Sequence, residues 1–232
     1  MALVKFGGGI IEMRGSIGGT TFSRNSTGNY ARAKTTPINP QTALQQTVRA
    51  AMAFLTDRWS ATLTANQRTA WNLYASSVQV LNRIGESVNI SGFNHYIRSN
   101  MIRKQYANPL VDEGPTVFEI PAADPTYSIS ASEAAQQITH TLDDALDWAT
   151  EDAAYVFFFC GKPQNPQINF FDGPWRKAGF IGGADPGGPI LPHAADSEWA
   201  ITTGQRIWTY ARISRADGRL SEKFRADTFC AA

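Results

Sequence analysis

Glycine is unusually dense at the beginning of the chain, where seven of the first 28 residues are glycine. Because glycine loses more backbone entropy on ordering than any other residue, this density disfavours helix. Short alternations of apolar and polar residues remain, and these permit strands once they pair with another segment. The apolar side chains are too few for a core of their own, so residues 1–39 are predicted to form an extended arm that partner molecules order. We expect its contacts to come from Arg14, Phe22, Arg24, Tyr30 and Arg32.

The same glycines do not predict a nucleotide site. The stretch Gly15-Ser16-Ile17-Gly18-Gly19 lacks the GxxxxGK[ST] spacing of a phosphate-binding loop, and no apolar strand precedes it. We therefore expect no cofactor.

The composition is that of a folded chain. Of 232 residues, 43% are hydrophobic and 18% are charged, which supplies a packed core and excludes wholesale disorder. No apolar run reaches the roughly 18 residues that a membrane span requires, and the first residues lack the pattern of a secretory signal. We expect no membrane partner.

The charges divide unevenly along the chain. Residues 1–110 contain 12 Lys/Arg and 3 Asp/Glu, a net charge of +9, whereas residues 111–232 contain 9 and 17, a net charge of −8. The basic half suits an acidic protein surface, the acidic half of a neighbouring copy, or nucleic acid, although two solvated surfaces would give the same pattern. Non-specific binding to nucleic acid would weaken steeply with salt. It would use Arg14, Arg24, Arg32, Arg49 and Arg58.

Residues 40–108 have the periodicity of three helices. The first is predicted to begin at Asn39-Pro40, the second at the capping box Thr64–Gln67, and the third after Ser91-Gly92. Cations near the end of the third helix suit the helix dipole and its polar side; they are Arg98, Arg103 and Lys104. One apolar stripe at a period of 3.6 residues runs along the first helix through Leu44, Val48, Met52, Leu55 and Trp59.

Proline and glycine then interrupt the chain, so residues 109–115 are predicted to be a linker. From residue 116 the period changes to that of short strands with Gly, Pro and Asp turns, which predicts an antiparallel β-sandwich over residues 116–232. The fold class is therefore α+β: an arm, a three-helix region and a sandwich. The predicted strands are Thr116–Ile120, Tyr127–Ser130, Gln136–Leu142, Ala153–Cys160, Gln167–Phe171, Glu198–Thr202, Arg206–Ser214 and Leu220–Phe229.

Two stretches resemble known families. The segments Arg14–Arg24, Gly28–Arg32, Pro37–Thr42, Leu63–Trp71 and Ser91–Ile97 together resemble a group of structural proteins of tailed-bacteriophage virions and a related bacterial family. This resemblance covers about 90 residues and implies a component of a phage particle. It implies no catalytic residue.

The second resemblance is at the end of the chain. Trp208–Ser214, followed by the Asp217-Gly218 turn, resembles the last hairpin of a fibronectin type III or immunoglobulin-like domain. The Cys…Trp…Cys arrangement of antibody domains is missing, and since Cys230 lies at the extreme C-terminus we do not expect the inter-sheet disulfide of that class. Cys160 is expected to be buried at the end of a strand.

Titratable groups are not arranged in any catalytic or metal-binding motif. His95 is predicted to be structural, His140 to face solvent from a strand, and His193 to lie in a loop. None belongs to a metal-binding pattern, and the acidic run Asp143–Asp152 lacks the glycine and terminal glutamate of a calcium loop. We expect no catalytic residue and no metal site.

These observations favour a non-enzymatic structural protein of a phage virion, either a capsid decoration or a head–tail neck component. Its expected partners are other virion proteins and copies of itself. The alternative is an adsorption or fibre-anchoring module whose sandwich binds a receptor or glycan. Its contacts would come from Trp175, Phe180 and Ile190, in and before the loop Gly182–Pro192.

Overall fold

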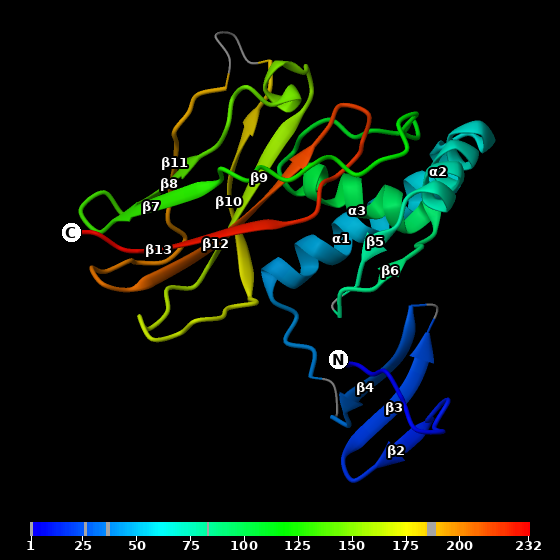
Figure 1. The fold of residues 1–232 in the computed structure, drawn as a ribbon. Helices are drawn as coiled ribbons and strands as arrows, with labels where there is room; N and C mark the ends of the chain where they lie inside the picture. Colours follow the sequence, from blue (N-terminus) through cyan, green and yellow to red (C-terminus); the bar gives the residue numbers. More distant parts are fainter. Residues whose placement is uncertain (1, 26, 36–37, 83, 185–188) are drawn as a thin grey trace.

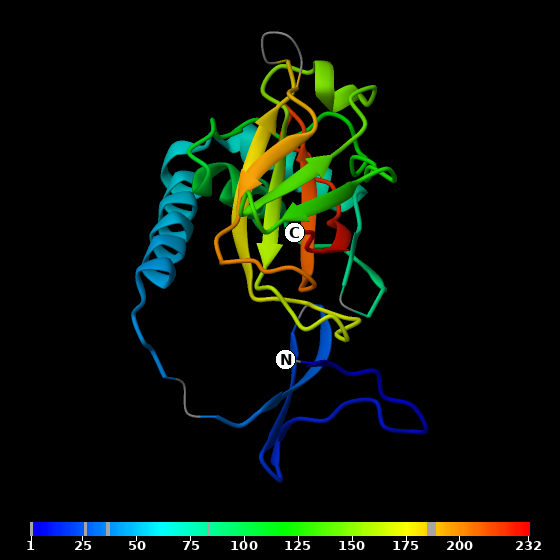
Figure 2. The same cartoon turned by 90° about the vertical axis from the view of Figure 1, so that its left-hand side faces the viewer.

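A computed structural model describes residues 2–25, 27–35, 38–82, 84–184 and 189–232. The described residues form three α-helices and several antiparallel sheets, which confirms the α+β class (Figure 1). A small sheet formed by the first strands lies at one end of the molecule in both views (Figures 1 and 2).

The glycine-rich leader folds into a four-stranded antiparallel sheet. Its strands are β1 (Ala2–Leu3), β2 (Gly15–Ile17), β3 (Thr20–Asn25) and β4 (Gly28–Ala33), in the order β1-β4-β3-β2. Gly18 and Gly19 form the two-residue turn between β2 and β3, with φ of 55° and 80°. Two consecutive positive φ values are what a tight hairpin requires, so these glycines close a hairpin. The leader therefore differs from the predicted extended arm because its alternating segments pair with one another.

The three helices begin at capping side chains. They are α1 (Ala43–Asp57), which continues into a π-helical turn over Arg58–Thr62, α2 (Ala65–Ser77) and α3 (Gly92–Gln105). The capping box of Thr64 and Gln67 is confirmed. Helix α3 begins at Gly92, close to its predicted start, and the hydroxyl of Ser91 caps it by accepting the amide of Asn94. Helix α1 begins later than predicted, because the hydroxyl of Thr42 accepts the amide of Gln45.

Only part of the apolar stripe of α1 is in the helical core. Leu55 is fully buried with Trp71, Tyr74 and Tyr96, and Trp59 packs against this cluster. The N-terminal part of the stripe is exposed, with 52% of Leu44 accessible. The periodicity predicts the helix and its face, but not how much of that face other elements cover.

Residues 109–115, predicted to be a linker, lie against the helices. The carbonyl of Asp112 accepts the indole N–H of Trp71 at 3.0 Å, and its carboxylate binds Arg58 at 2.5 and 2.8 Å. The side-chain amide of Asn100 donates to the carbonyl of Val111 and accepts from the backbone N–H of Val111. These contacts fix the course of the segment between the helices and the following strands.

The close packing of this segment gives a first testable prediction. A Cβ atom at Gly114 would lie 2.6 Å from the carbonyl carbon of Ala70 and from the amide nitrogen of Trp71, so Gly114→Ala forces the segment away from α2. We expect urea denaturation to show a loss of about 1–3 kcal/mol in unfolding free energy. Gly7→Ala is the matched control, because nothing lies within 4 Å of the added methyl. Equal stabilities of the two variants would contradict this packing.

The C-terminal region contains two antiparallel sheets. One has the order β10-β9-β12-β13, from Trp175–Gly182, Tyr155–Gly161, Arg206–Ser214 and Phe224–Phe229. The other has the order β11-β8-β7, from His193–Asp196, Gln137–Thr141 and Ser128–Ser132. Shorter elements are the hairpin β5 (Val80–Leu81) and β6 (Ser87–Val88) and a 3-10 turn over Asp147–Thr150.

The two sheets pack through one face of each. Val156, Phe158, Ala211 and Ile213 of the four-stranded sheet share a core with Tyr127 and Ile129, at the start of the three-stranded sheet. A second cluster joins Ile207 and Cys160 to Ala131 and Ile138. Both cysteines are buried and free, as expected for Cys160.

Some of the predicted strands agree with the structure and others do not. Strand β12 has the predicted bounds, and β9 is buried along nearly its whole length as its apolar run predicts. The strands predicted at 116–120, 167–171 and 198–202 are wrong, since none of these ranges contains a strand. Strands β10 and β11 were not predicted. In β10 the pairing with β9 is interrupted by a bulge between Lys177 and Gly179, which hides the alternation of a regular strand.

The helices cover the other face of the four-stranded sheet. The hydroxyl of Tyr106 donates to the carbonyl of Phe158 at 2.6 Å, and its ring packs against Phe157 and Phe180. Arg103 is fully buried here, although its place near the helix end predicts a cation on the polar side. The order of layers is therefore helices, four-stranded sheet, three-stranded sheet. None of the described helices has the length and apolar character of a membrane span.

Candidate functional site

The N-terminal sheet has no core of its own. Within the described part of residues 2–35, every side chain is exposed or only half-buried. Apolar side chains on it face solvent, including 90% of Ile11 and 68% of Ile17. A small sheet needs a buried apolar face or packing against another element to be stable. The other described parts of the chain therefore leave the apolar side chains of this sheet largely uncovered.

The strand register divides the predicted contact residues between the two faces of the sheet. Phe22 pairs with Ala31 and Arg24 with Asn29, so Phe22 and Arg24 share one face. Tyr30 pairs with Ser23 and Arg32 with Thr21, on the opposite face. Arg14 lies just before β2. The structure thus places four of the five predicted residues on this sheet and Arg14 beside it, but does not bring them together on one side.

The sheet is basic. Residues 1–35 contain five Lys/Arg and one glutamate, a net charge of +4. That glutamate, Glu12, binds Arg14 at 2.5 Å and lies 4.0 Å from Arg24. Arg32 is exposed and forms no ion pair with any described residue. A positive, partly apolar surface suits an acidic protein partner.

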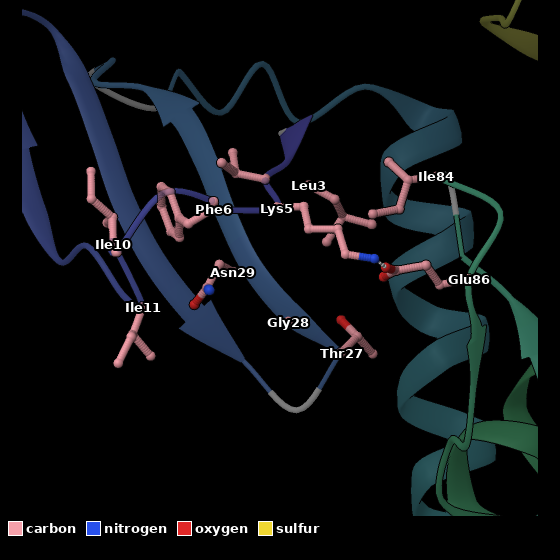
Figure 3. A pocket seen from close by; sticks show the side chains of 13 residues that line it. Leu3, Lys5, Phe6, Ile10, Ile11, Thr27, Gly28, Asn29, Ile84 and Glu86 are labelled. Atoms are coloured by element: carbon pink, nitrogen blue, oxygen red, sulfur yellow. Dashed lines mark hydrogen bonds and ion pairs between the residues drawn. The ribbon is translucent and has the colours of Figure 1, made fainter.

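A hollow of about 480 Å³ separates the sheet from the rest of the molecule (Figure 3). Residues 3–7, 9–11 and 27–29 line it from the sheet side, and Ile84 and Glu86 line it from the turn between β5 and β6. Lys5 reaches across to Glu86 at 2.6 Å. Their hydrogen bond raises the pKa of Lys5 and lowers the pKa of Glu86. An exposed ion pair contributes little stability, so the sheet is held only weakly.

Sequence reasoning missed this junction. Glu86 and Lys5 are 81 residues apart, and neither belongs to a motif. The excess of cations in the leader was the one signal that it needs an acidic neighbour.

The connector to α1 adds little attachment. It contains Ile38, of which 89% is exposed. Among the described residues its side chains form only local hydrogen bonds with α1: Asn39 accepts from Arg49 at 2.9 Å, and the hydroxyl of Thr42 accepts from the amide of Gln45.

The residues predicted as a contact loop lie apart. Trp175 and Phe180 belong to β10, where Trp175 packs edge-on against Tyr210 and Phe180 against Tyr106. Ile190 is 80% exposed beyond the strand. Of the predicted loop Gly182–Pro192, residues 185–188 lie outside the described residues. The structure does not gather these three side chains into one described binding surface.

The five arginines considered for nucleic acid are similarly divided. Arg58 is engaged by Asp112 within the helical region, whereas Arg14 and Arg24 share Glu12 on the N-terminal sheet. Arg49 lies in the middle of α1 and donates to the side chain of Asn39.

The histidines occupy structural positions. His140 was predicted to face solvent, which is wrong: it is fully buried, and its Nδ1 lies 2.9 Å from the hydroxyl of Tyr127. Burial lowers the pKa of His140 to about 3, and burial lowers that of His95 to about 4. His193 lies in β11 opposite His140 rather than in a loop.

Nucleophilic and metal chemistry have little support in the described residues. Burial raises the pKa of the Cys160 thiol to about 11, so the thiolate is disfavoured at neutral pH. No group of three or more potential metal ligands occurs in the described ranges. No protein-family model, curated protein or solved structure matches the chain.

Proposed function

We propose that the protein is a structural component of a bacteriophage virion, a capsid decoration or head–tail neck protein that assembles through its N-terminal sheet. The observation that carries the proposal is the coreless sheet of residues 2–33, held to the body by an exposed ion pair and a connector. Ordering a residue costs about 1–2 kcal/mol, so such a sheet needs contacts outside its own chain. The resemblance of residues 14–105 to virion proteins supplies the class of assembly.

The charge distribution supports a partner of acidic character. The sheet carries a net charge of +4, and its short edge strands leave backbone groups unpaired. A strand of another protein adds to such an edge through backbone hydrogen bonds, while the charges select the partner. In this proposal other virion proteins, and further copies of the chain, bind the sheet, and the protein resides in the virion and performs no catalysis.

We further propose that residues 116–232 are a sandwich of the fibronectin type III or immunoglobulin-like kind. In chain order, its seven strands divide into a three-stranded sheet with the order 5-2-1 and a four-stranded sheet with the order 4-3-6-7. Seven antiparallel strands shared between two sheets with Greek-key connections are the architecture of these domains. In this proposal the domain is the stable body of the protein, and the N-terminal sheet attaches that body to the particle.

The test compares the full chain with a variant lacking residues 2–33. No residue of the three apolar cores lies in this segment, so we expect the variant to unfold at the same temperature as the full chain. Tagged copies of both are expressed in cells that produce the particle, and purified particles are probed for the tag. We expect the full chain in the particles and at least a tenfold loss of the variant.

Two controls sharpen this test. Arg24→Glu with Arg32→Glu reverses exposed charges on the two faces of the sheet and should also reduce incorporation. Arg68→Glu changes an arginine of α2 and should not. Incorporation of the truncated chain at the full level would refute assembly through this sheet.

A further inference from the structure

A second hollow, outside the N-terminal sheet, contains a half-buried cation that bonds to no described residue. It has a volume of about 490 Å³ and lies between the β5–β6 hairpin, the segment 170–172 and strands β12 and β13. Three cations and two carboxylates line it. They are Arg212, Lys223, Arg225, Asp172 and Glu222.

The two carboxylates are already engaged. Asp172 binds Lys223 at 3.3 Å and Arg225 at 2.6 Å. Glu222 binds Arg98, of α3, at 2.8 Å. Each acid of the hollow thus has a cation that holds it, and neither bonds to Arg212.

Arg212 is left with unused donors. It lies on the helix-facing side of β12, opposite Phe157, and is mostly buried. It forms no hydrogen bond or ion pair with any described residue. A guanidinium presents five N–H donors, and those of Arg212 are not sealed from solvent, so a ligand in the hollow can reach them. Burial lowers the pKa of Arg212 to about 10, and the nearby charge of Arg98 acts in the same direction.

We propose that this hollow is an oxyanion-binding site, in which Arg212 binds a phosphate or carboxylate group through its paired N–H donors. Among the described residues, the lining has one cation more than it has carboxylates, so a bound anion balances this charge. A planar guanidinium matches either group with two parallel hydrogen bonds. Leu81 and Phe170 border the hollow and are 59% and 72% exposed, so a ligand can enter beside them.

The test measures the thermal unfolding of the full chain in sodium phosphate and in sodium acetate, against sodium chloride at matched ionic strength. Binding to the native state alone raises Tm, and we expect a rise of roughly 3 °C at saturation. A rise in phosphate only assigns a phosphate group, and a rise in both salts assigns a general oxyanion site. No rise in either salt overturns the proposal.

Substitution locates the effect. Arg212→Met should abolish the rise while keeping an apolar chain against Phe157, and Arg212→Lys should weaken the apparent affinity roughly tenfold because it loses the fork. Arg68→Met is the control, since its guanidinium binds the carbonyls of Trp59 and Ser60 outside the hollow. Should Arg212→Met fail to fold, the lysine variant alone decides. An unchanged response in the Arg212 variants would overturn the assignment.

Discussion

Arg103→Met is expected to destabilise the protein by about 3–5 kcal/mol, a large part of the stability of a typical domain. The guanidinium of Arg103 is fully buried and donates to the hydroxyl of Ser214 and to three backbone carbonyls. These carbonyls belong to Pro109, Ala153 and Arg215, at 3.2, 3.0 and 2.7 Å. A methionine fills similar space but leaves the hydroxyl of Ser214 and the carbonyls of Pro109 and Ala153 without this donor, and each such loss is costly. The carbonyl of Arg215 keeps the amide of Gly218. Urea denaturation at neutral pH measures the effect.

Lys104→Met is the matched control for this variant. Lys104 is the next residue on α3 and is exposed, with its ammonium 3.9 Å from the ring centre of Phe54. Its loss should cost about 1 kcal/mol or less. Because Arg103 joins the helices to the sheets, we expect its loss to weaken both regions. Similar losses for the two variants would show that the buried network carries little stability.

Acid is expected to weaken the fold at pH values where most carboxylates are still ionised. Folding lowers the pKa of His95 to about 4 and of His140 to about 3, both by burial. Below an ordinary histidine pKa of about 6.5, the unfolded chain therefore binds protons that the native chain does not. Stability is complete at pH 7 and falls as the pH drops from 6.5 towards 4. The slope is about 1.4 kcal/mol per pH unit for each histidine.

The surroundings of both rings act in this direction. The guanidinium of Arg98 lowers the pKa of His95 further, and His193 lies opposite His140 with its own pKa lowered by burial. Unfolding free energies at pH 7, 6 and 5 measure the slope before most carboxylates titrate. His140→Phe keeps a ring against Phe158 and should remove about half of the slope. A flat profile between pH 7 and 5 would be incompatible with two buried neutral histidines.

Local signals in the sequence predicted much of the fold. The caps at Thr64 and Ser91, strand β12 and the buried strand β9 follow from side-chain chemistry within a few residues. Long-range contacts were beyond such signals. In the sequence Arg103 is an ordinary cation near a helix end. Its burial depends on hydrogen-bond acceptors from segments far along the chain, such as Ser214 and Ala153. The alternation of His140 with apolar residues predicts a side chain that faces solvent. The structure instead buries His140, and the hydroxyl of Tyr127, just before the neighbouring strand, lies at hydrogen-bond distance from its ring.

The sequence predicted which segment forms the candidate site, but it did not predict that this segment folds into a sheet. The glycine content correctly singled out the leader as lacking apolar material, and none of its described side chains is buried. The hairpin was missed because two glycines at a turn look the same as glycines in an irregular chain until the flanking strands pair. The junction at Glu86 depends on a contact across 81 residues that no local pattern reveals.

The nine residues between the N-terminal sheet and α1 have a mechanical consequence. Fully extended, residues 34–42 span about 30 Å. The body could therefore swivel while the sheet stays anchored, once the ion pair between Lys5 and Glu86 opens. A connector of this length would let different copies of the chain hold the sheet at different angles to the body without straining either fold.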